Sequence, residues 1–149
     1  MELKAFLSGQ VYPIEQADDP VFSAKILGDG IIIEPTSNVI VAPCDGVITA
    51  TFPDSMHAVG ISCENGMHII IHEGIGTVSL QGEGFQMFVQ KGDHVTAGDR
   101  LFSFDANILK EHGCSATCIF AVTNYSLFPT LTFYTDMEAE AGKTVFAEV

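Results

Sequence analysis

The stretch Ala58-Val-Gly-Ile-Ser-Cys-Glu-Asn-Gly-Met-His-Ile-Ile-Ile-His72 predicts two apolar strands joined by a tight turn. Its centre, Glu64-Asn65-Gly66, supplies residues that tolerate the positive φ angles of hairpin turns. A hairpin that turns there pairs residues whose numbers add up to about 130, so His57 is expected nearly opposite His72 or Glu73. The resulting hypothesis is that two imidazole rings lie within a few ångströms of each other. The alternative is that the two histidines are structurally unrelated.

Short apolar segments recur along the chain and are interrupted by turn residues about every eight to twelve positions, which is typical of an all-β sandwich or barrel. Several segments are apolar on both faces, so we expect antiparallel sheets that enclose one core. The predicted strands are Ile31–Glu34, Val39–Ala42, Gly46–Phe52, Ala58–Cys63, His68–His72, Phe85–Val89, Arg100–Phe104, Cys118–Val122 and Thr144–Glu148.

One segment predicts a short helix. Asp105 is suited to cap its start, Ile108, Leu109 and His112 share a face, and Gly113 is suited to end it. No linker rich in Ser, Pro or Gly and no low-complexity stretch divides the chain. We therefore expect residues 1–149 to form a single domain.

The chain is strongly acidic, with 6 Lys and Arg against 19 Asp and Glu and a formal net charge of −13. This balance argues against nucleic acid and anionic membranes as partners, because both bind clustered cations. It favours a basic protein partner. The longest aliphatic runs, Ile31-Ile-Ile33 and Ile69-Ile-Ile71, are too short to insert into a membrane, and Met1–Gly9 does not resemble a signal peptide. We therefore expect a cytoplasmic protein.

The four cysteines, Cys44, Cys63, Cys114 and Cys118, include no Cys-x-x-Cys pair. Neither a zinc ribbon nor a thioredoxin-like site is indicated. The spacing of Cys114 and Cys118 allows two neighbouring thiols, but ordinary buried thiols without partners are the expectation for a reducing compartment.

Among the histidines, His72 is the main candidate for chemistry. It ends an apolar strand and is followed by two glycines, Gly74 and Gly76, which leave room for the backbone of a partner or for a phosphate. His68, at the start of the same strand, is expected at the surface, as are His94 and His112.

Two segments, Lys91–Asp99 and Met137–Lys143, look alike, since each has a short acidic turn, a small residue and a glycine before a strand. They resemble the hairpins of hybrid-motif β-sandwiches, which also occur in biotinyl and lipoyl carriers. Neither lysine of these segments follows a methionine, as the modified lysine of such carriers does. We therefore expect a duplicated hybrid motif and no cofactor.

Five longer segments follow one another along the chain: Gly9-Gln-Val-Tyr-Pro-Ile, Asp19-Pro-Val-Phe-Ser-Ala-Lys-Ile-Leu-Gly-Asp-Gly30, Ala42-Pro-Cys-Asp-Gly-Val, His57-Ala-Val-Gly-Ile and Gly66-Met-His-Ile-Ile-Ile-His-Glu-Gly-Ile-Gly-Thr-Val78. They resemble, in the same order, the motifs of the IIA domain of the glucose class of the phosphoenolpyruvate-dependent sugar phosphotransferase system. With shorter matches further along, the resemblance extends to about residue 148.

The resemblance implies a phosphoryl relay. His72 would accept a phosphoryl group from the phosphohistidine of the carrier HPr and pass it to a cysteine of a IIB domain. His57 would help to hold the phosphoryl group, and the hydroxyl of Ser55 would complete a hydrogen-bond network. The acid at the rim of the docking surface corresponds to Asp29.

Other neighbours of His72 suit such chemistry. Phe52, Ile70 and Val78 are apolar and would exclude water, while backbone N–H groups beside Gly74 and Gly76 would stabilise phosphoryl oxygens. We further expect Nδ1–H of His72 to be held by a backbone carbonyl, which would leave Nε2 as the nucleophile.

Two residues depart from the family pattern. Gly76 replaces the aspartate before Thr-Val, and Glu73 replaces a usually apolar residue after the active histidine. Glu73 could take over a contact with an arginine of the carrier, or it could disfavour a phosphoryl dianion on His72 by like-charge repulsion.

Two alternatives stay open beside the relay. One is a divergent IIA-like module that regulates by binding and does not transfer phosphate efficiently. The other is a zinc hydrolase, because His57 and His72 could form an incidental zinc site; the absence of a His-x-His pair ranks it last.

Overall fold

The computed structural model describes all residues from Met1 to Val149 and contains mostly β-strands. The strands are β1 (Glu2–Lys4), β2 (Gly9–Pro13), β3 (Asp29–Pro35), β4 (Val39–Val41), β5 (Gly46–Ala50), β6 (Ala58–Cys63), β7 (His68–Ile75), β8 (Phe85–Met87), β9 (His94–Val95), β10 (Arg100–Phe104), β11 (Ser115–Val122), β12 (Thr132–Phe133), β13 (Met137–Ala139) and β14 (Val145–Glu148). The helices are α1 (Pro20–Ser23) and α2 (Ala106–Glu111), with 3-10 turns η1 (Ile14–Gln16), η2 (Thr77–Leu80) and η3 (Tyr125–Leu127).

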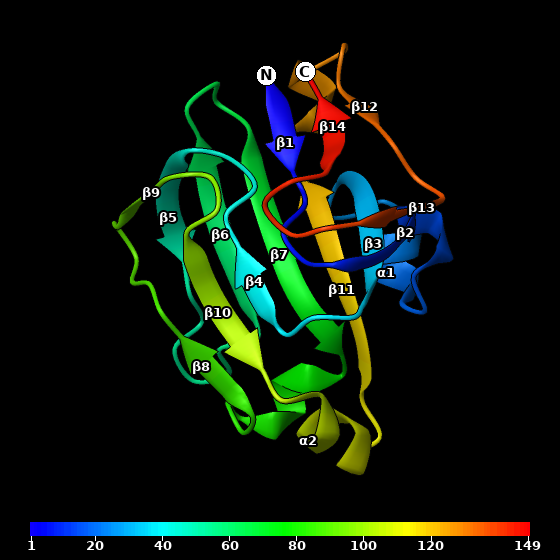
Figure 1. Ribbon diagram of the computed structural model, residues 1–149, viewed down its shortest axis with the longest axis vertical. Coiled ribbons are helices and arrows are strands. Elements are labelled where there is room, and N and C mark those ends of the chain that lie inside the picture. Colours follow the sequence, from blue (N-terminus) through cyan, green and yellow to red (C-terminus); the bar gives the residue numbers. More distant parts are fainter.

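These strands form three antiparallel sheets, which confirms the predicted all-β sandwich. The largest has eight strands in the order β13-β2-β3-β11-β7-β6-β5-β9. A sheet of β4-β10-β8 lies in front of it in Figure 1, and a third sheet of β1-β14-β12 lies at the end that carries both termini. No helix of the chain is long and apolar enough to cross a membrane.

The β6–β7 hairpin has the register that the sequence predicts. Ala58 pairs with His72 and Ser62 with His68, so paired numbers add up to the expected value. On its other side β7 pairs with β11, where Ile119 is the partner of His72. His72 therefore lies on an interior strand of the eight-stranded sheet, which fixes its backbone on both sides.

The two faces of the eight-stranded sheet have different surroundings. Odd-numbered residues of β7, such as Ile69 and Ile71, enter the main core of 30 buried residues. Even-numbered residues, such as Ile70 and His72, are partly buried on the opposite face. That face carries a smaller buried cluster: Ile14, Ala17, Phe22, Ile32, Ile119 and Ala121. The alternation of side chains along a strand thus separates the core from the face that carries His72.

The sequence predicted one helix, whereas the structure has two, α1 and α2. Helix α2 forms where expected, with the Asp105 carboxylate accepting from the backbone N–H groups of Asn107 and Ile108. The additional helix, α1, spans a single turn, begins with Pro20 and is capped by Asp19. A helix this short has no hydrophobic periodicity, so only its cap and its proline mark it in the sequence.

The two ends of the chain lie side by side (Figure 1). Strand β1 pairs with β14, with Leu3 opposite Ala147. The amino group of Met1 donates to the Val149 carbonyl at 2.6 Å, and the Val149 N–H donates back to the Met1 carbonyl at 2.9 Å.

Candidate functional site

His57 and His72 meet on the outer face of the eight-stranded sheet. Their ring centroids are 4.6 Å apart and their planes are nearly perpendicular, at 85°. His72 belongs to β7, whereas His57 immediately precedes β6, and its carbonyl accepts from the backbone N–H of Glu73 at 2.7 Å. The hypothesis of two neighbouring imidazoles is confirmed.

Ser55 fixes the orientation of the His57 ring. The hydroxyl of Ser55 is 2.7 Å from Nδ1 of His57, and both residues are buried. The turn that carries them is tight, since the backbone N–H groups of Ser55 and Met56 both donate to the Phe52 carbonyl. Phe52 and Met56 adopt positive φ angles of 49° and 51° in this turn. When the Ser55 hydroxyl donates to Nδ1, the ring proton of His57 is on Nε2.

The ring of His72 is held neutral. Burial is the main cause that lowers its pKa to about 4, and the neighbouring His57 lowers it further. The backbone of Gly74 and the carboxylate of Asp19 favour the protonated ring and act against that lowering of the pKa. Burial also lowers the pKa of His57. At neutral pH both rings are therefore uncharged, and His72 has a free lone pair.

The two ring nitrogens of His72 differ in their surroundings. Nδ1 is buried and makes no hydrogen bond of standard geometry, but the backbone of Gly74 lies close enough to the His72 ring to raise its pKa. The bond from Nδ1–H to a backbone carbonyl stays a prediction, with Gly74 as the candidate acceptor. The side chain of His72 is partly exposed, and Nε2 is not enclosed as Nδ1 is. Nε2 is therefore the ring nitrogen that is open to a ligand. Burial of Nδ1 therefore leaves Nε2 as the candidate reactive nitrogen.

Two phenylalanines flank the imidazoles. Phe22 of α1 packs on His72 with ring centroids 5.2 Å apart, and Phe52 packs on His57 at 5.7 Å. Phe22 is buried, whereas Phe52 is 42% exposed. The pair of histidines thus has an apolar surround that is open on the side of Phe52.

The loop after β7 is built around two glycines. Gly74 and Gly76 have φ angles of 79° and 78°, in the left-handed region that favours glycine. The hydroxyl of Thr77 donates to the Glu73 carbonyl at 2.7 Å and closes the loop. Gly76 is exposed, and Val78 of η2 is 60% exposed.

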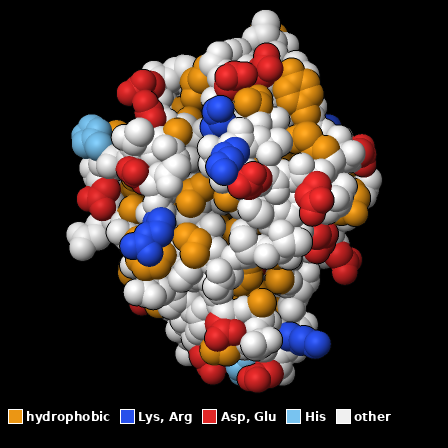
Figure 2. All heavy atoms as spheres, viewed as in Figure 1, with side chains coloured by type: hydrophobic (Ala, Val, Ile, Leu, Met, Phe, Trp, Pro, Cys, Tyr) orange, Lys and Arg blue, Asp and Glu red, His pale blue; other side chains and the backbone are white.

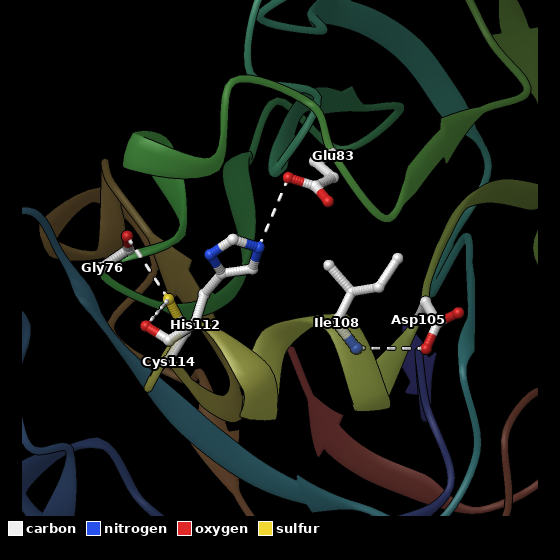
Figure 3. Close-up of polar contacts among 6 residues, drawn as sticks. All are labelled: Gly76, Glu83, Asp105, Ile108, His112 and Cys114. Atoms are coloured by element: carbon white, nitrogen blue, oxygen red, sulfur yellow. Dashed lines mark hydrogen bonds and ion pairs between the residues drawn. The ribbon is translucent and has the colours of Figure 1, made fainter.

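Residues around α2 hold this loop from the outside (Figure 3). The thiol of Cys114 lies 3.7 Å from the Gly76 carbonyl, to which it donates. His112 lies 3.4 Å from a carboxylate oxygen of Glu83. His112, His94 and His68 are exposed, as expected.

Glu73 is not at the surface. Its side chain is fully buried on the core face of the sheet, opposite Cys118 of β11, and neither carboxylate oxygen has a hydrogen-bond partner. Burial raises the pKa of Glu73 well above its ordinary value, and the nearby Glu34 raises it further, although a contact with Cys118 opposes the shift. Of the two possibilities left open for Glu73, a direct contact with a carrier does not fit the structure, because the side chain is fully buried. Like-charge repulsion of a phosphoryl dianion is not favoured either, since the raised pKa keeps the carboxyl group protonated.

Asp29 lies on β3, which is separated from β7 by β11 in the eight-stranded sheet. It begins β3, where its carboxylate is 3.5 Å from the Lys25 ammonium. No further His, Cys, Asp or Glu side chain joins His57 and His72 in a cluster of three suited to hold a metal ion.

A family model provides the decisive comparison. The family described as phosphoenolpyruvate-dependent sugar phosphotransferase system, EIIA 1, matches residues 1–128. The chain belongs to this family. It is thus an EIIA-type component of a sugar phosphotransferase system.

Individual relatives agree with this assignment of the EIIA chain. A glucose-specific EIIA component of Bacillus cereus is 39% identical over 143 residues, which are 96% of this chain and 86% of the relative. A glucose-specific EIICBA component of Staphylococcus carnosus is 40% identical over 118 residues, which are 79% of this chain and 17% of that protein. The solved structure of the glucose permease IIA from Mycoplasma capricolum superposes with a TM-score of 0.88 at 33% identity, covering 99% of this chain and 94% of that one.

Sequence reasoning missed two residues at the EIIA site. Phe22 packs on His72, and Asp19 both caps α1 and acts on the charge of the His72 ring. The Asp19-Pro20 step carried the only local signal, which is that of a helix start. Nothing in the sequence indicates that this helix folds over β7.

Proposed function

We propose that the chain accepts a phosphoryl group on Nε2 of His72 from the phosphohistidine of HPr and passes it to a cysteine of a IIB domain during sugar uptake. The observation that carries the proposal is a neutral His72 ring, with Nδ1 buried, in contact with the ring of His57. The proposed phosphotransferase acts in the cytoplasm, and residues 1–149 form one relay domain.

In the first step the lone pair of His72 Nε2 attacks phosphorus while the bond between phosphorus and the carrier imidazole breaks. Catalysis of such a transfer depends on alignment and on stabilisation of the equatorial oxygens. His57 suits the second task when the Ser55 hydroxyl donates to its Nδ1, because the ring proton is then on Nε2 and available to a phosphoryl oxygen. Backbone N–H groups around Gly74 and Gly76 would supply further donors.

In the second step a thiolate of the IIB domain attacks the same phosphorus atom, and His72 leaves as neutral imidazole. The low pKa of the His72 ring supports this step, because a weakly basic nitrogen is a better leaving group. Phe22, Phe52, Ile70 and Val78 would limit hydrolysis between the two steps by excluding water.

The test is transfer from phosphoenolpyruvate through enzyme I and HPr to the full chain, followed by detection of an acid-labile phosphate. The wild type is expected to carry phosphate and His72→Gln to carry none. His57→Gln is expected to accept phosphate and to pass it on poorly. His68→Gln is the matched control, because His68 lies on the same strand but is exposed.

Phosphorus NMR of the phosphorylated chain assigns the bond. An Nε2 adduct is expected, and an Nδ1 adduct would contradict the proposed geometry. A folded wild type that takes up no phosphate would instead support the alternative of a IIA-like regulatory module that acts by binding alone.

A further inference from the structure

Two cysteines outside the histidine site are in direct contact. The sulfur atoms of Cys44 and Cys63 are 2.8 Å apart, and the residues are 19 positions apart in the sequence. Cys63 ends β6, where its backbone is the partner of Gly46 in β5, and Cys44 stands just before that strand. The pairing of β5 with β6 therefore brings the two cysteine backbones close together and places their sulfur atoms in contact.

We propose that Cys44 and Cys63 form a redox-active dithiol that a small neutral oxidant, hydrogen peroxide, converts into a disulfide. The sulfur atoms need to approach by less than about 1 Å to reach the S–S bond length of about 2.05 Å. Cys44 and Cys63 thus differ from the expectation of ordinary buried thiols without partners, because each has the other as its partner.

The other two cysteines have different neighbours. Cys118 is fully buried opposite Glu73, and Cys114 donates to backbone carbonyls of Gly76 and His112. Neither makes a thiol–thiol contact. Disulfide formation is therefore specific to Cys44 and Cys63.

The surroundings of the pair select the kind of oxidant. Cys44 and Cys63 are only 3% and 4% exposed, but each lines a surface hollow. Asp45 and Glu64 line both hollows. These carboxylates repel anionic oxidants such as oxidised glutathione, whereas uncharged hydrogen peroxide is small enough to enter.

A hydrogen bond joins the two thiols. That bond is the first cause that raises the pKa of Cys44, ahead of burial and of the nearby Asp45 and Glu64. Either thiol can be the donor in this contact, so either sulfur can act as the nucleophile once its proton is lost, and both routes end in the same disulfide.

The reaction balances with one molecule of peroxide. In the route through Cys63, its thiolate attacks one peroxide oxygen, the O–O bond breaks, and the released hydroxide combines with the proton lost by Cys63 to give water. The sulfur of Cys44 then attacks the sulfenic sulfur of Cys63, and the sulfenic oxygen leaves as a second water with the proton of Cys44. The route through Cys44 exchanges the two sulfur atoms. Two thiols are oxidised to one disulfide, and one peroxide is reduced to two waters.

The disulfide would close a loop that contains β5 and the turn with Ser55 and His57. Closing such a loop restricts the unfolded chain, so the melting temperature is expected to rise by about 6 to 12 °C. Reduction with dithiothreitol should reverse the shift.

The experiment treats the full chain with hydrogen peroxide, alkylates the remaining thiols under denaturing conditions, and maps tryptic peptides. No Lys or Arg lies between Ile26 and Lys91, so Cys44 and Cys63 are in one peptide, while Cys114 and Cys118 are together in residues 111–143. Loss of two of the four alkylatable thiols is expected, with both retained in peptide 111–143. Peptide 26–91 should contain the reducible bond.

Variants and a second oxidant complete the test. Cys44→Ala and Cys63→Ala should each abolish both the disulfide and the rise in melting temperature, whereas the matched control Cys114→Ala should keep both. Oxidised glutathione should react at least about tenfold more slowly than peroxide. A disulfide that involves Cys114 or Cys118, oxidation of peptide 26–91 to sulfinic acid without a disulfide, or an unchanged wild type would overturn the proposal.

Discussion

The protonation state of His72 links the candidate site to folding stability. Burial lowers the pKa of its ring to about 4 in the folded protein, whereas an unfolded chain has the ordinary value of 6.5. Between these two values the unfolded chain binds a proton that the folded protein does not bind. The contribution of His72 to the free energy of unfolding is therefore present above pH 6.5 and falls as the pH is lowered to 4.

The expected size of this loss is about 3 kcal/mol across that pH window. It is measured as the difference between wild type and His72→Gln in urea unfolding at pH 7, 5.5 and 4. The wild type should lose stability relative to the variant as the pH falls. A difference that does not depend on pH would mean that the ring is not held neutral.

Glu73 should give the opposite dependence. Its pKa is raised in the folded protein by burial, so its contribution to stability is present below the ordinary value of 4.5 and is lost as the pH rises. Glu73→Gln removes the titration while nearly preserving the shape of the side chain. The melting temperature of the variant relative to wild type should therefore rise between pH 5 and pH 8. A constant difference over this range would contradict a buried, neutral Glu73.

At the scale of elements, helix α1 connects a cap to the site. The carboxylate of Asp19 accepts from the backbone N–H groups of Val21 and Phe22, and Phe22 packs on His72. Asp19→Ala should lower the free energy of unfolding by about 1 kcal/mol through loss of the cap. It should also lower the pKa of His72 further, because the Asp19 carboxylate favours the protonated ring.

Urea unfolding and an NMR titration of the histidine ring measure these two effects of the Asp19 substitution. Asp18→Ala is the matched control, since Asp18 is exposed and does not cap the helix. If Asp19→Ala and Asp18→Ala had equal effects on stability and on the pKa of His72, the effects would come from the loss of one negative charge and not from loss of the helix cap.

Elements with strong local signals could be predicted from the sequence. The β6–β7 hairpin followed from a turn of Asn and Gly between apolar runs, and its register placed His57 beside His72. Strands β6 and β10 have the predicted limits. By contrast, β1, β2 and α1 were not predicted, because they are short and are stabilised by distant partners: β1 by β14, β2 by β3 and β13, and α1 by packing over the sheet.

The residues of the candidate site also fall into a group that the sequence predicts and a group that it does not. Neighbours through the hairpin were predicted, but Phe22 and Asp19 were not, because they reach His72 through a long-range packing that leaves no periodic signal. The orientation of Glu73 could have been derived, since adjacent residues of a strand point to opposite faces. A partly exposed His72 therefore requires a Glu73 that points into the core.

At the scale of the whole molecule, charge should govern association. The net charge is −13, and acidic side chains outnumber basic ones on the face of the β4-β10-β8 sheet shown in Figure 2. If the proposed relay holds, the encounter with a basic HPr should be accelerated by attraction and slowed by salt. The transfer rate constant should fall by about fivefold or more between 50 and 500 mM NaCl, measured by rapid-quench phosphorylation.

Val78→Ala is the control for this effect of salt. It removes exposed apolar surface without changing the charge, so it should weaken association and leave the dependence on salt unchanged. A transfer rate that does not depend on salt in the wild type would contradict electrostatic guidance.

The pairing of β1 with β14 has a topological consequence. Because Met1 and Val149 exchange backbone hydrogen bonds, a short linker could join them without crossing the histidine face, and the chain would become a ring with the same strand order. Such a ring could be opened in the exposed turn at Lys91 and Gly92, far along the chain from both imidazoles. The fold is therefore suited to circular permutation, and its strand order does not depend on where the polypeptide starts.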